Sequence, residues 1–262
     1  MDPVAFSIGS LSIRWYGIMA ALGFISALFI INRKKKFAGI TTEQLSDQMT
    51  LVIFAAIFGA RAFYVVQNWA VFRANPSEII RIDHGGLVFY GGLICAIAVM
   101  IAYCVKKKIS FVKMMDITAP GLAFGHGVGR IGCFINGCCF GKPTALPWGH
   151  VYPEGTIPHQ CYQSMPLHPV QLYETFGNLV IAAVLFYYVG KLKKGIILSL
   201  YLILYGTMRF LDEFLRGDHS EFLFGLFTPA QSIGLLIIPV GIACFIYFKR
   251  LPDDGSRLNS KA

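Results

Sequence analysis

The segment 125–142, GHGVGRIGCFINGCCFGK, places polar and reactive side chains inside an otherwise apolar run. If it is helical, His126, Arg130, Cys133 and Gly137 share one face, because they follow one another at three- or four-residue intervals. An arginine at membrane depth costs about 2.5 to 3.5 kcal/mol on insertion scales, so it normally faces a polar cavity and an anionic partner. We infer that this partner is a phosphate group, which a guanidinium binds through two parallel hydrogen bonds.

Two structural interpretations compete with this chemistry. Arg130 could pair with Glu174 or Glu213 and only hold helices together. His126 could be a packing residue, as an isolated histidine in an apolar helix often is. Its position one turn before Arg130 supports a polar role, so the two interpretations have equal weight. The glycines of the segment would let backbones or a ligand come close, as small residues do between helices in lipid.

The composition indicates a polytopic membrane protein. Of 262 residues, 55% are hydrophobic and only 14% are charged, and the mean hydropathy is +0.60, which is too apolar for an ordinary soluble domain. The net charge of +9 comes from short basic clusters between apolar runs. Such clusters encode membrane topology, so we expect no nucleic-acid partner.

Apolar runs long enough to cross about 30 Å of hydrocarbon predict an all-α fold with seven transmembrane helices in one domain, residues 1–250, followed by a polar tail, residues 251–262. The expected helices cover residues 14–32, 48–67, 87–105, 113–136, 169–189, 195–214 and 228–248. Basic clusters follow the first, third, fifth and seventh. By the positive-inside rule, the N-terminus is therefore outside, the C-terminus is cytoplasmic, and the 137–168 loop is extracytoplasmic.

The outer ends of the expected helices gather the other candidate site residues. They are Tyr16, Arg61, Tyr90, Asn136, Gly137, His168, Gln171, Glu174, Arg209, Glu213 and Arg216. Arginines beside acids, amides and ring hydroxyls suit an anionic phospholipid, because guanidinium groups grip phosphate and stabilise the charge that gathers on it as it leaves.

Several of these residues have structural alternatives. Arg61 could extend to the lipid headgroups, and the paired glycines around Tyr90 could serve helix packing. Arg209, Glu213 and Arg216 follow one another at i, i+4 and i+7, so they could form only a local ladder of ion pairs.

The seven cysteines fall into two groups. Those at 95, 104 and 244 lie in apolar helices and are interpreted as packing residues. The second group, with a possible role, is Cys133, Cys138, Cys139 and Cys161. On the oxidising side of a membrane, Cys138 or Cys139 is expected to form a structural disulfide with Cys161. A zinc site from these three and His159 would match no standard ligand spacing, and no metal or cofactor is expected.

Six motifs together resemble one family. WYG, GARAFYVV, GGLVFYGGL, GRIGCFINGCCFG, HPVQLYE and RFLDEFLR occur in this order over nearly the whole chain, and the chain resembles the phosphatidylglycerol:prolipoprotein diacylglyceryl transferases. The resemblance implies transfer of the diacylglyceryl group of phosphatidylglycerol to the lipobox cysteine of a prolipoprotein signal peptide, with release of glycerol phosphate. It also implies a site in the bacterial plasma membrane that faces the extracytoplasmic leaflet, among membrane lipids.

The same resemblance assigns roles by position. Arg130 matches the signature arginine that meets the phospholipid, and Arg209 matches a second required arginine. Further motif positions are occupied by Asn136, Gly137, Tyr16, Glu213 and Arg216.

The sequence departs from the family pattern at three positions. Cys133 replaces an asparagine, Cys138 replaces an acid, and Tyr90 replaces a histidine proposed in relatives as the base. An unperturbed tyrosine has a pKa near 10, so His126 is the expected base and Tyr90 an orienting or relaying group.

Two other functions were weighed. The cysteines of the outer loop would suit a thiol–disulfide oxidoreductase, but adjacent cysteines are a poor redox pair. Arginines at membrane depth would suit an anion transporter, but transporters tend to have internal repeats, and none is visible in this sequence.

Overall fold

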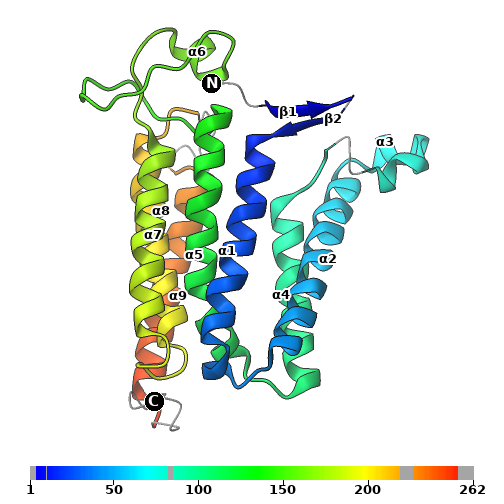
Figure 1. Cartoon of the computed structure of the whole chain (residues 1–262), viewed down its shortest axis with the longest axis vertical. Coiled ribbons are helices and arrows are strands. Elements are labelled where there is room, and N and C mark those ends of the chain that lie inside the picture. Colours follow the sequence, from blue (N-terminus) through cyan, green and yellow to red (C-terminus); the bar gives the residue numbers. More distant parts are fainter. Residues whose placement is uncertain (1–3, 10, 82–84, 219–226, 253–262) are drawn as a thin grey trace. The chain divides into compact units, whose positions relative to one another are not determined.

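The computed structural model describes residues 4–9, 11–81, 85–218 and 227–252, which are mostly helical (Figure 1). The chain forms two compact units. The first combines Met1–Phe37 with Met115–Ala262, and the second is Ala38–Met114.

Each of the seven predicted segments contains a long helix. These are α1 (Trp15–Ala38), α2 (Thr42–Gln67), α4 (Phe89–Lys107), α5 (Phe111–Asn136), α7 (Val170–Tyr188), α8 (Ile196–Asp212) and α9 (Pro229–Arg250). Shorter elements are the strands β1 (Val4–Ile8) and β2 (Leu11–Arg14), the helices α3 (Trp69–Ala74) and α6 (Ile157–Tyr162), and the 3-10 turns η1 (Pro76–Ile80) and η2 (Glu213–Leu215).

The largest differences from the predicted boundaries occur at polar helix ends. Helix α2 begins six residues before the predicted start because Thr41 and Gln44 form a capping box, in which each side chain bonds the other residue's backbone N–H. Helix α1 continues through its basic cluster to Ala38. A hydrophobic window marks the apolar part of a helix and misses such polar turns. The antiparallel hairpin β1–β2 before α1 was not predicted.

Among the described residues, five helices are long and apolar enough to cross a membrane: α1, α2, α4, α7 and α9. The other two predicted spans, α5 and α8, do not reach that combined length and hydropathy. Helix α5 has 26 residues but carries Arg130, His126 and five glycines between 121 and 132, and α8 has only 17 residues. The chain is therefore a multi-pass membrane protein.

The glycines of α5 let neighbouring helices approach it closely. In Figure 1, α5 lies between α1 and α7. A Cβ added at Gly125 would lie 2.9 Å from the carbonyl oxygen of Gly23 in α1, and one at Gly127 would lie 3.2 Å from that of Thr175 in α7. The glycines thus serve helix packing, as small residues do in lipid.

The opposite end of α5 is anchored by Asp116. This carboxylate is fully buried and accepts hydrogen bonds from the backbone N–H groups of Gly195, at 2.6 Å, and Leu198, at 2.8 Å. It therefore caps the start of α8, whose first N–H groups have no partner within the helix.

The second unit contains a close pair of helices, α2 and α4. A Cβ on Gly59 or Gly91 would lie 2.6 Å from the carbonyl oxygen of the other residue, and one on Gly92 would lie 2.8 Å from that of Ala56. The glycine pair after Tyr90 therefore supports helix packing, one of the two alternatives that the sequence left open.

Candidate active site

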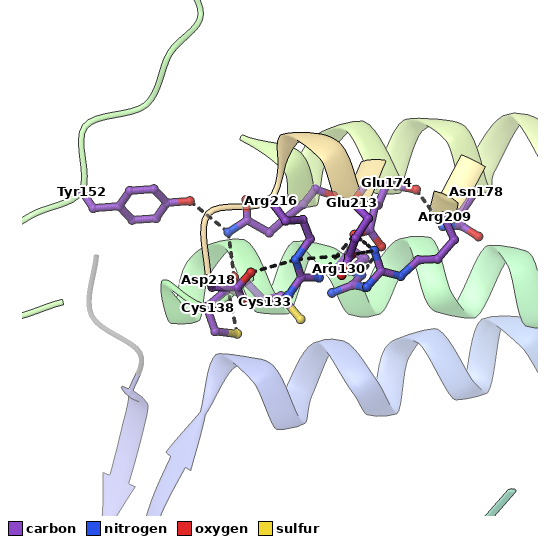
Figure 2. Close-up of polar contacts among 12 residues, drawn as sticks. Arg130, Cys133, Cys138, Tyr152, Glu174, Asn178, Arg209, Glu213, Arg216 and Asp218 are labelled. Carbon is purple, nitrogen blue, oxygen red and sulfur yellow. Dashed lines mark hydrogen bonds and ion pairs between the residues drawn. The ribbon is translucent and has the colours of Figure 1, made fainter. Parts of the chain in front are cut away.

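A fully buried carboxylate, Glu174 of α7, lies at the centre of three arginines (Figure 2). Its Oε2 is 2.6 Å from Arg130 Nε of α5. Its Oε1 is 3.8 Å from Arg209 Nη1 and 3.8 Å from Arg216 Nη1. The arrangement brings together charges from α5, α7 and the end of α8, as the sequence predicted for these residues.

Two further acids complete the charge cluster. Glu213 Oε2 lies 2.5 Å from Arg209 Nη1 and 4.0 Å from Arg216 Nε. Asp218 accepts two parallel hydrogen bonds from Arg216, from Nε at 2.8 Å and from Nη2 at 2.7 Å. Three arginines therefore face three carboxylates. The ion-pair ladder and the pairing of Arg130 with Glu174, which the sequence left open as structural alternatives, are both present.

The arginines differ in how much of their guanidinium is engaged. Among the residues that the structure describes, Arg130 makes its ion pair through Nε and Arg209 makes both of its pairs through Nη1. Arg216 engages Nε, Nη1 and Nη2. Arg130 and Arg209 thus retain terminal nitrogens that can donate to a further anion, such as a phosphate.

Helix α7 holds Glu174 in place with a row of buried polar residues. Thr175 Oγ1 donates to the carbonyl of Gly127 in α5, at 3.1 Å, and Asn178 Nδ2 donates to the carbonyl of Glu174, at 2.8 Å. Gln171, fully buried, donates to the carbonyl of Cys138, at 2.7 Å. The bonds of Thr175 and Gln171 fix α7 against α5 and against the loop that follows α5.

The end of α5 is a turn that Gly137 makes possible. Its φ of 68° is left-handed, its N–H bonds the carbonyl of Phe134, and the N–H of Cys138 bonds the carbonyl of Cys133, both at 3.1 Å. This pattern is a Schellman motif, which ends a helix and satisfies its last carbonyls. It turns Cys138 back toward Cys133. Asn136 is the last helical residue.

The sulfur ligand atoms of Cys133, Cys138 and Cys139 all lie within 4.8 Å of one another. All seven cysteines are free thiols, and Cys161 is exposed. The predicted disulfide from Cys138 or Cys139 to Cys161 is therefore wrong. The helix turn brings Cys138 to Cys133, whereas Cys161 belongs to the separate short helix α6.

The loop between α5 and α7 packs its aromatic residues behind this turn. Tyr152 is buried, and its hydroxyl accepts a hydrogen bond from Gln171 at 2.9 Å. Burial raises the pKa of Tyr152 to about 12, although the bond from Gln171 opposes the shift. The ring of His150 packs against Phe134 and Tyr152 at 4.9 and 4.7 Å, and burial lowers its pKa.

The two predicted histidines have different surroundings. His126, half-buried in α5, has its ring 5.4 Å from that of Tyr205 in α8. His168 precedes α7, where its Nδ1 lies 3.3 Å from the hydroxyl of Tyr173. That hydroxyl also accepts a hydrogen bond from Trp148 at 2.7 Å. His168 therefore belongs to an aromatic network at the mouth of α7, and its side chain does not cap the helix, whose N-cap residue is Pro169.

Arg61 lies in the second unit, where backbone carbonyls surround its guanidinium. The acceptors are Ile79, Gly85, Gly86, Glu78 and Arg81, at 2.5 to 3.1 Å. Gly85 and Gly86 have left-handed φ values of 79° and 74°, which glycine adopts without strain. Arg61 is only 8% exposed, which argues against extension to the headgroups and indicates that it shapes the segment before α4.

The two predicted tyrosines are both about half exposed. Tyr90 begins α4 in the second unit and contacts the ring of Phe89. Tyr16 begins α1, where a Cβ on Gly132 would lie 3.2 Å from its Cα. Tyr16 is thus next to the part of α5 that carries Arg130 and Cys133, whereas Tyr90 and Arg61 belong to the other unit.

Sequence reasoning missed two residues of the cluster and its surroundings. Asp218 follows a helix and has no periodic partner, and Tyr152 lies in a loop rich in proline and glycine. A signal existed for Asp218, because Arg216-Gly217-Asp218 puts an acid two residues after an arginine across a glycine.

Comparison with known proteins gives consistent matches over the whole length. A family model described as prolipoprotein diacylglyceryl transferase matches residues 3–247. A phosphatidylglycerol–prolipoprotein diacylglyceryl transferase of Finegoldia magna is 38% identical over 252 residues, which cover 95% of this chain and 97% of the relative. Proteins of the same name are 37% identical in Vibrio cholerae, with 95% and 93% covered, and 35% identical in Clostridium tetani, with 94% and 97% covered.

Proposed function

Because this chain belongs to the prolipoprotein diacylglyceryl transferase family, we propose that it transfers the diacylglyceryl group of phosphatidylglycerol to the lipobox cysteine of prolipoproteins. The acceptor sulfur forms a thioether bond to the glycerol carbon. The bond between that carbon and the phosphate oxygen breaks, and its electron pair leaves on glycerol phosphate. The thiol proton goes to a base or to solvent. Family membership supports this reaction over the oxidoreductase and the anion transporter.

The observation that carries the proposal is the partial engagement of Arg130 and Arg209. Both contact buried acids, yet both retain terminal nitrogens among the described contacts. Fixed donors of this kind stabilise charge that develops on a leaving phosphate far better in a dry site than in water. Arg130 and Arg209 are therefore assigned to the phosphate, and Glu174 and Glu213 orient their guanidinium groups.

The remaining predicted residues take supporting roles in the proposal. Asn136 and Gly137 shape the end of α5, Gln171 fixes the following loop, and His168 lies at the mouth of α7. Tyr16 lines the lipid path beside α5. Arg61 shapes the segment before α4 in the second unit, and Tyr90 keeps the orienting or relaying role that the resemblance suggested. His126 remains the candidate base, because an unperturbed imidazole can take up a proton near neutral pH.

The proposal includes the seven-span topology in a bacterial plasma membrane, with the site toward the extracytoplasmic leaflet. A helix of the length of α5 extends about 39 Å, more than the roughly 30 Å of hydrocarbon. Its charges are compensated within the protein, which supports a buried span. A reporter that works only outside the cytoplasm should be active when fused in the 140–165 loop and inactive after Arg250. The reverse pattern would contradict this topology.

The decisive experiment measures transfer of labelled diacylglyceryl from phosphatidylglycerol to a lipobox peptide. Arg130→Ala and Arg209→Ala should each lose about 10²- to 10³-fold in rate, and Arg130→Lys should remain severely impaired because lysine lacks the planar fork. Arg73→Ala is a matched control that removes an arginine from α3, outside the charge cluster. Variants are compared at equal expression and thermal stability, and near wild-type turnover in both alanine variants would make the arginines structural.

A further inference from the structure

We propose that Cys133, Cys138 and Cys139 bind a thiophilic divalent metal ion, for which zinc is the best match, and that the acceptor cysteine of the substrate is its fourth ligand. The three protein ligands follow from the geometry of the turn after α5. The identity of the fourth ligand rests on the proposed function, in which a substrate thiol must be activated at this place.

The spacing of the sulfur atoms suits a metal centre. All three lie within 4.8 Å of one another. Among the described residues, they form the one group of at least three side chains close enough together to hold a metal ion. Three sulfurs bound tetrahedrally to zinc at about 2.3 Å would be about 3.8 Å apart. Each pair therefore has to close by about 1 Å at most, which side-chain rotation can supply.

The backbone brings these ligands together before any metal arrives. The Schellman turn at Gly137 places Cys138 above Cys133, and Gln171 fixes the carbonyl of Cys138 at 2.7 Å. Cys139 adopts a φ of 63°, which is rare for a residue with a Cβ and costs about 1 to 2 kcal/mol. A strained residue that completes a cluster of like ligands is typical of a functional site.

The ligand count points to a reacting centre. Structural zinc sites are closed by four protein ligands, whereas catalytic sites use three and leave the fourth position to water or substrate. The remaining outer-loop cysteine, Cys161, is exposed and is not in the group. Cys133 is buried, but Cys138 and Cys139 are partly accessible, so a fourth ligand can enter from their side.

The position of the cluster matches the proposed reaction. Cys133 lies one turn after Arg130 on α5, and Figure 2 shows the sulfur atoms of Cys133 and Cys138 beside the arginines. Three thiolates and a dication carry a net charge of −1, and they lie one turn of α5 from the guanidinium group of Arg130. A metal also keeps adjacent thiols from oxidising on the side where disulfides persist.

The chemistry balances without a separate strong base. The acceptor thiol binds the metal as a thiolate and releases its proton to water, because coordination deprotonates a thiol outright. The metal-bound sulfur then forms its bond to the glycerol carbon while the carbon–oxygen bond to phosphate breaks. The electron pair leaves on the phosphate near Arg130 and Arg209. The thioether is a weaker ligand than a thiolate and departs, so the metal returns to its starting state.

The first test is metal content. Full-length protein purified in detergent, without chelators, should contain about one zinc ion per chain. The zinc content of the double variant Cys138→Ser/Cys139→Ser should be less than about one tenth of the wild-type content, since the variant lacks two of the three ligands. Cys95→Ser/Cys244→Ser is the matched control, because it removes two cysteines from α4 and α9, outside the cluster, and it should retain the metal.

The second test uses the unmodified protein and so does not depend on a variant that folds. Cobalt(II) replaces zinc, and its thiolate charge-transfer band reports the number of bound sulfurs. The band should appear on loading and strengthen when a lipobox peptide is added, but it should not strengthen with the same peptide carrying serine in place of cysteine. Transfer activity, measured in parallel, should fall with a membrane-compatible chelator and return with zinc.

The outcomes separate the two proposals. Protein that transfers the diacylglyceryl group but holds no metal and ignores the chelator would overturn the metal site and leave the function intact. A disulfide between two of the three cysteines, found by mass spectrometry of the native protein, would overturn it too. Protein that binds zinc through these cysteines, transfers nothing and gives no peptide-dependent band would refute the proposed function and the fourth ligand.

Discussion

Arg130 and Glu174 meet between α5 and α7 at 2.6 Å, through the Nε atom of the arginine rather than its terminal nitrogens. Arg130 can therefore form a structural ion pair through Nε and still bind phosphate through its terminal nitrogens. The carboxylate orients the plane of the guanidinium, and the outer edge of the group is the part that can meet a lipid. Such a second contact is the usual way in which an active-site residue is held in a productive orientation.

Neutralising Glu174 should destabilise the protein strongly. Glu174→Gln leaves Arg130, Arg209 and Arg216 with one buried carboxylate fewer, and removing one partner of a buried pair costs about 3 to 5 kcal/mol. Thermal unfolding in detergent measures the loss. The double variant Glu174→Gln/Arg130→Gln restores the charge balance and should recover part of the stability. Equal melting temperatures for wild type and Glu174→Gln would contradict the central role of this acid.

Removing the carboxylate of Asp218 should strengthen product inhibition. In Asp218→Asn, Arg216 loses the bidentate one of its anionic partners, and its Nε and Nη2 become better donors to phosphate. Glycerol phosphate should therefore inhibit at a concentration about three- to tenfold lower, or about 0.7 to 1.4 kcal/mol. The inhibition constant in the transfer assay checks this. Weaker inhibition would show that Asp218 organises Arg216 for phosphate instead of competing with it.

A methyl group at Gly125 should separate α1 from α5. Gly125→Ala places a Cβ 2.9 Å from the backbone carbonyl of Gly23, and such overpacking costs about 1 to 3 kcal/mol. Gly129→Ala is the matched control, since a Cβ there meets nothing within 4 Å and both changes gain the same helix propensity. The melting temperature should fall for Gly125→Ala alone. Similar values for the two variants would argue against close contact of these helices.

Acid should loosen the loop between α5 and α7 through His150. Its pKa is lowered by burial, so the unfolded chain takes up a proton at a higher pH than the folded one. Stability is therefore complete above the unfolded pKa of about 6.5 and declines as the pH falls through it. Melting curves between pH 7.5 and 5.5 should show this decline, and His150→Gln should reduce it. An unchanged pH dependence in the variant would assign the decline to other groups.

Sequence patterns predicted most of the fold, because apolar runs and helical periodicity are local signals. All seven long helices follow from them, and so does the alignment of Arg209, Glu213 and Arg216 on one face. A charge at membrane depth requires a partner, and the sequence left Glu174 and Glu213 open as acidic partners of Arg130; the structure pairs it with Glu174.

Features that depend on how the chain turns were not predicted. The cysteine cluster arises because α5 ends at Gly137, which brings together residues that a continuous helix would place on different faces. The carbonyls around Arg61 come from an irregular segment with no periodicity. Asp218 and Tyr152 reach the site from segments outside the long helices, where spacing carries no information about direction.

The neutrality of the charge cluster also constrains how the chain is made. In the proposed seven-span arrangement, Arg130 and Glu174 belong to two helices, α5 and α7, that leave the ribosome at different times, and each of these helices inserted alone would expose an unpaired charge to lipid. Helix α5 is synthesised first and has to wait for α7. We expect the insertion machinery to retain these helices together and release them into the bilayer as one group, so that assembly of the site and entry into the membrane become a single event.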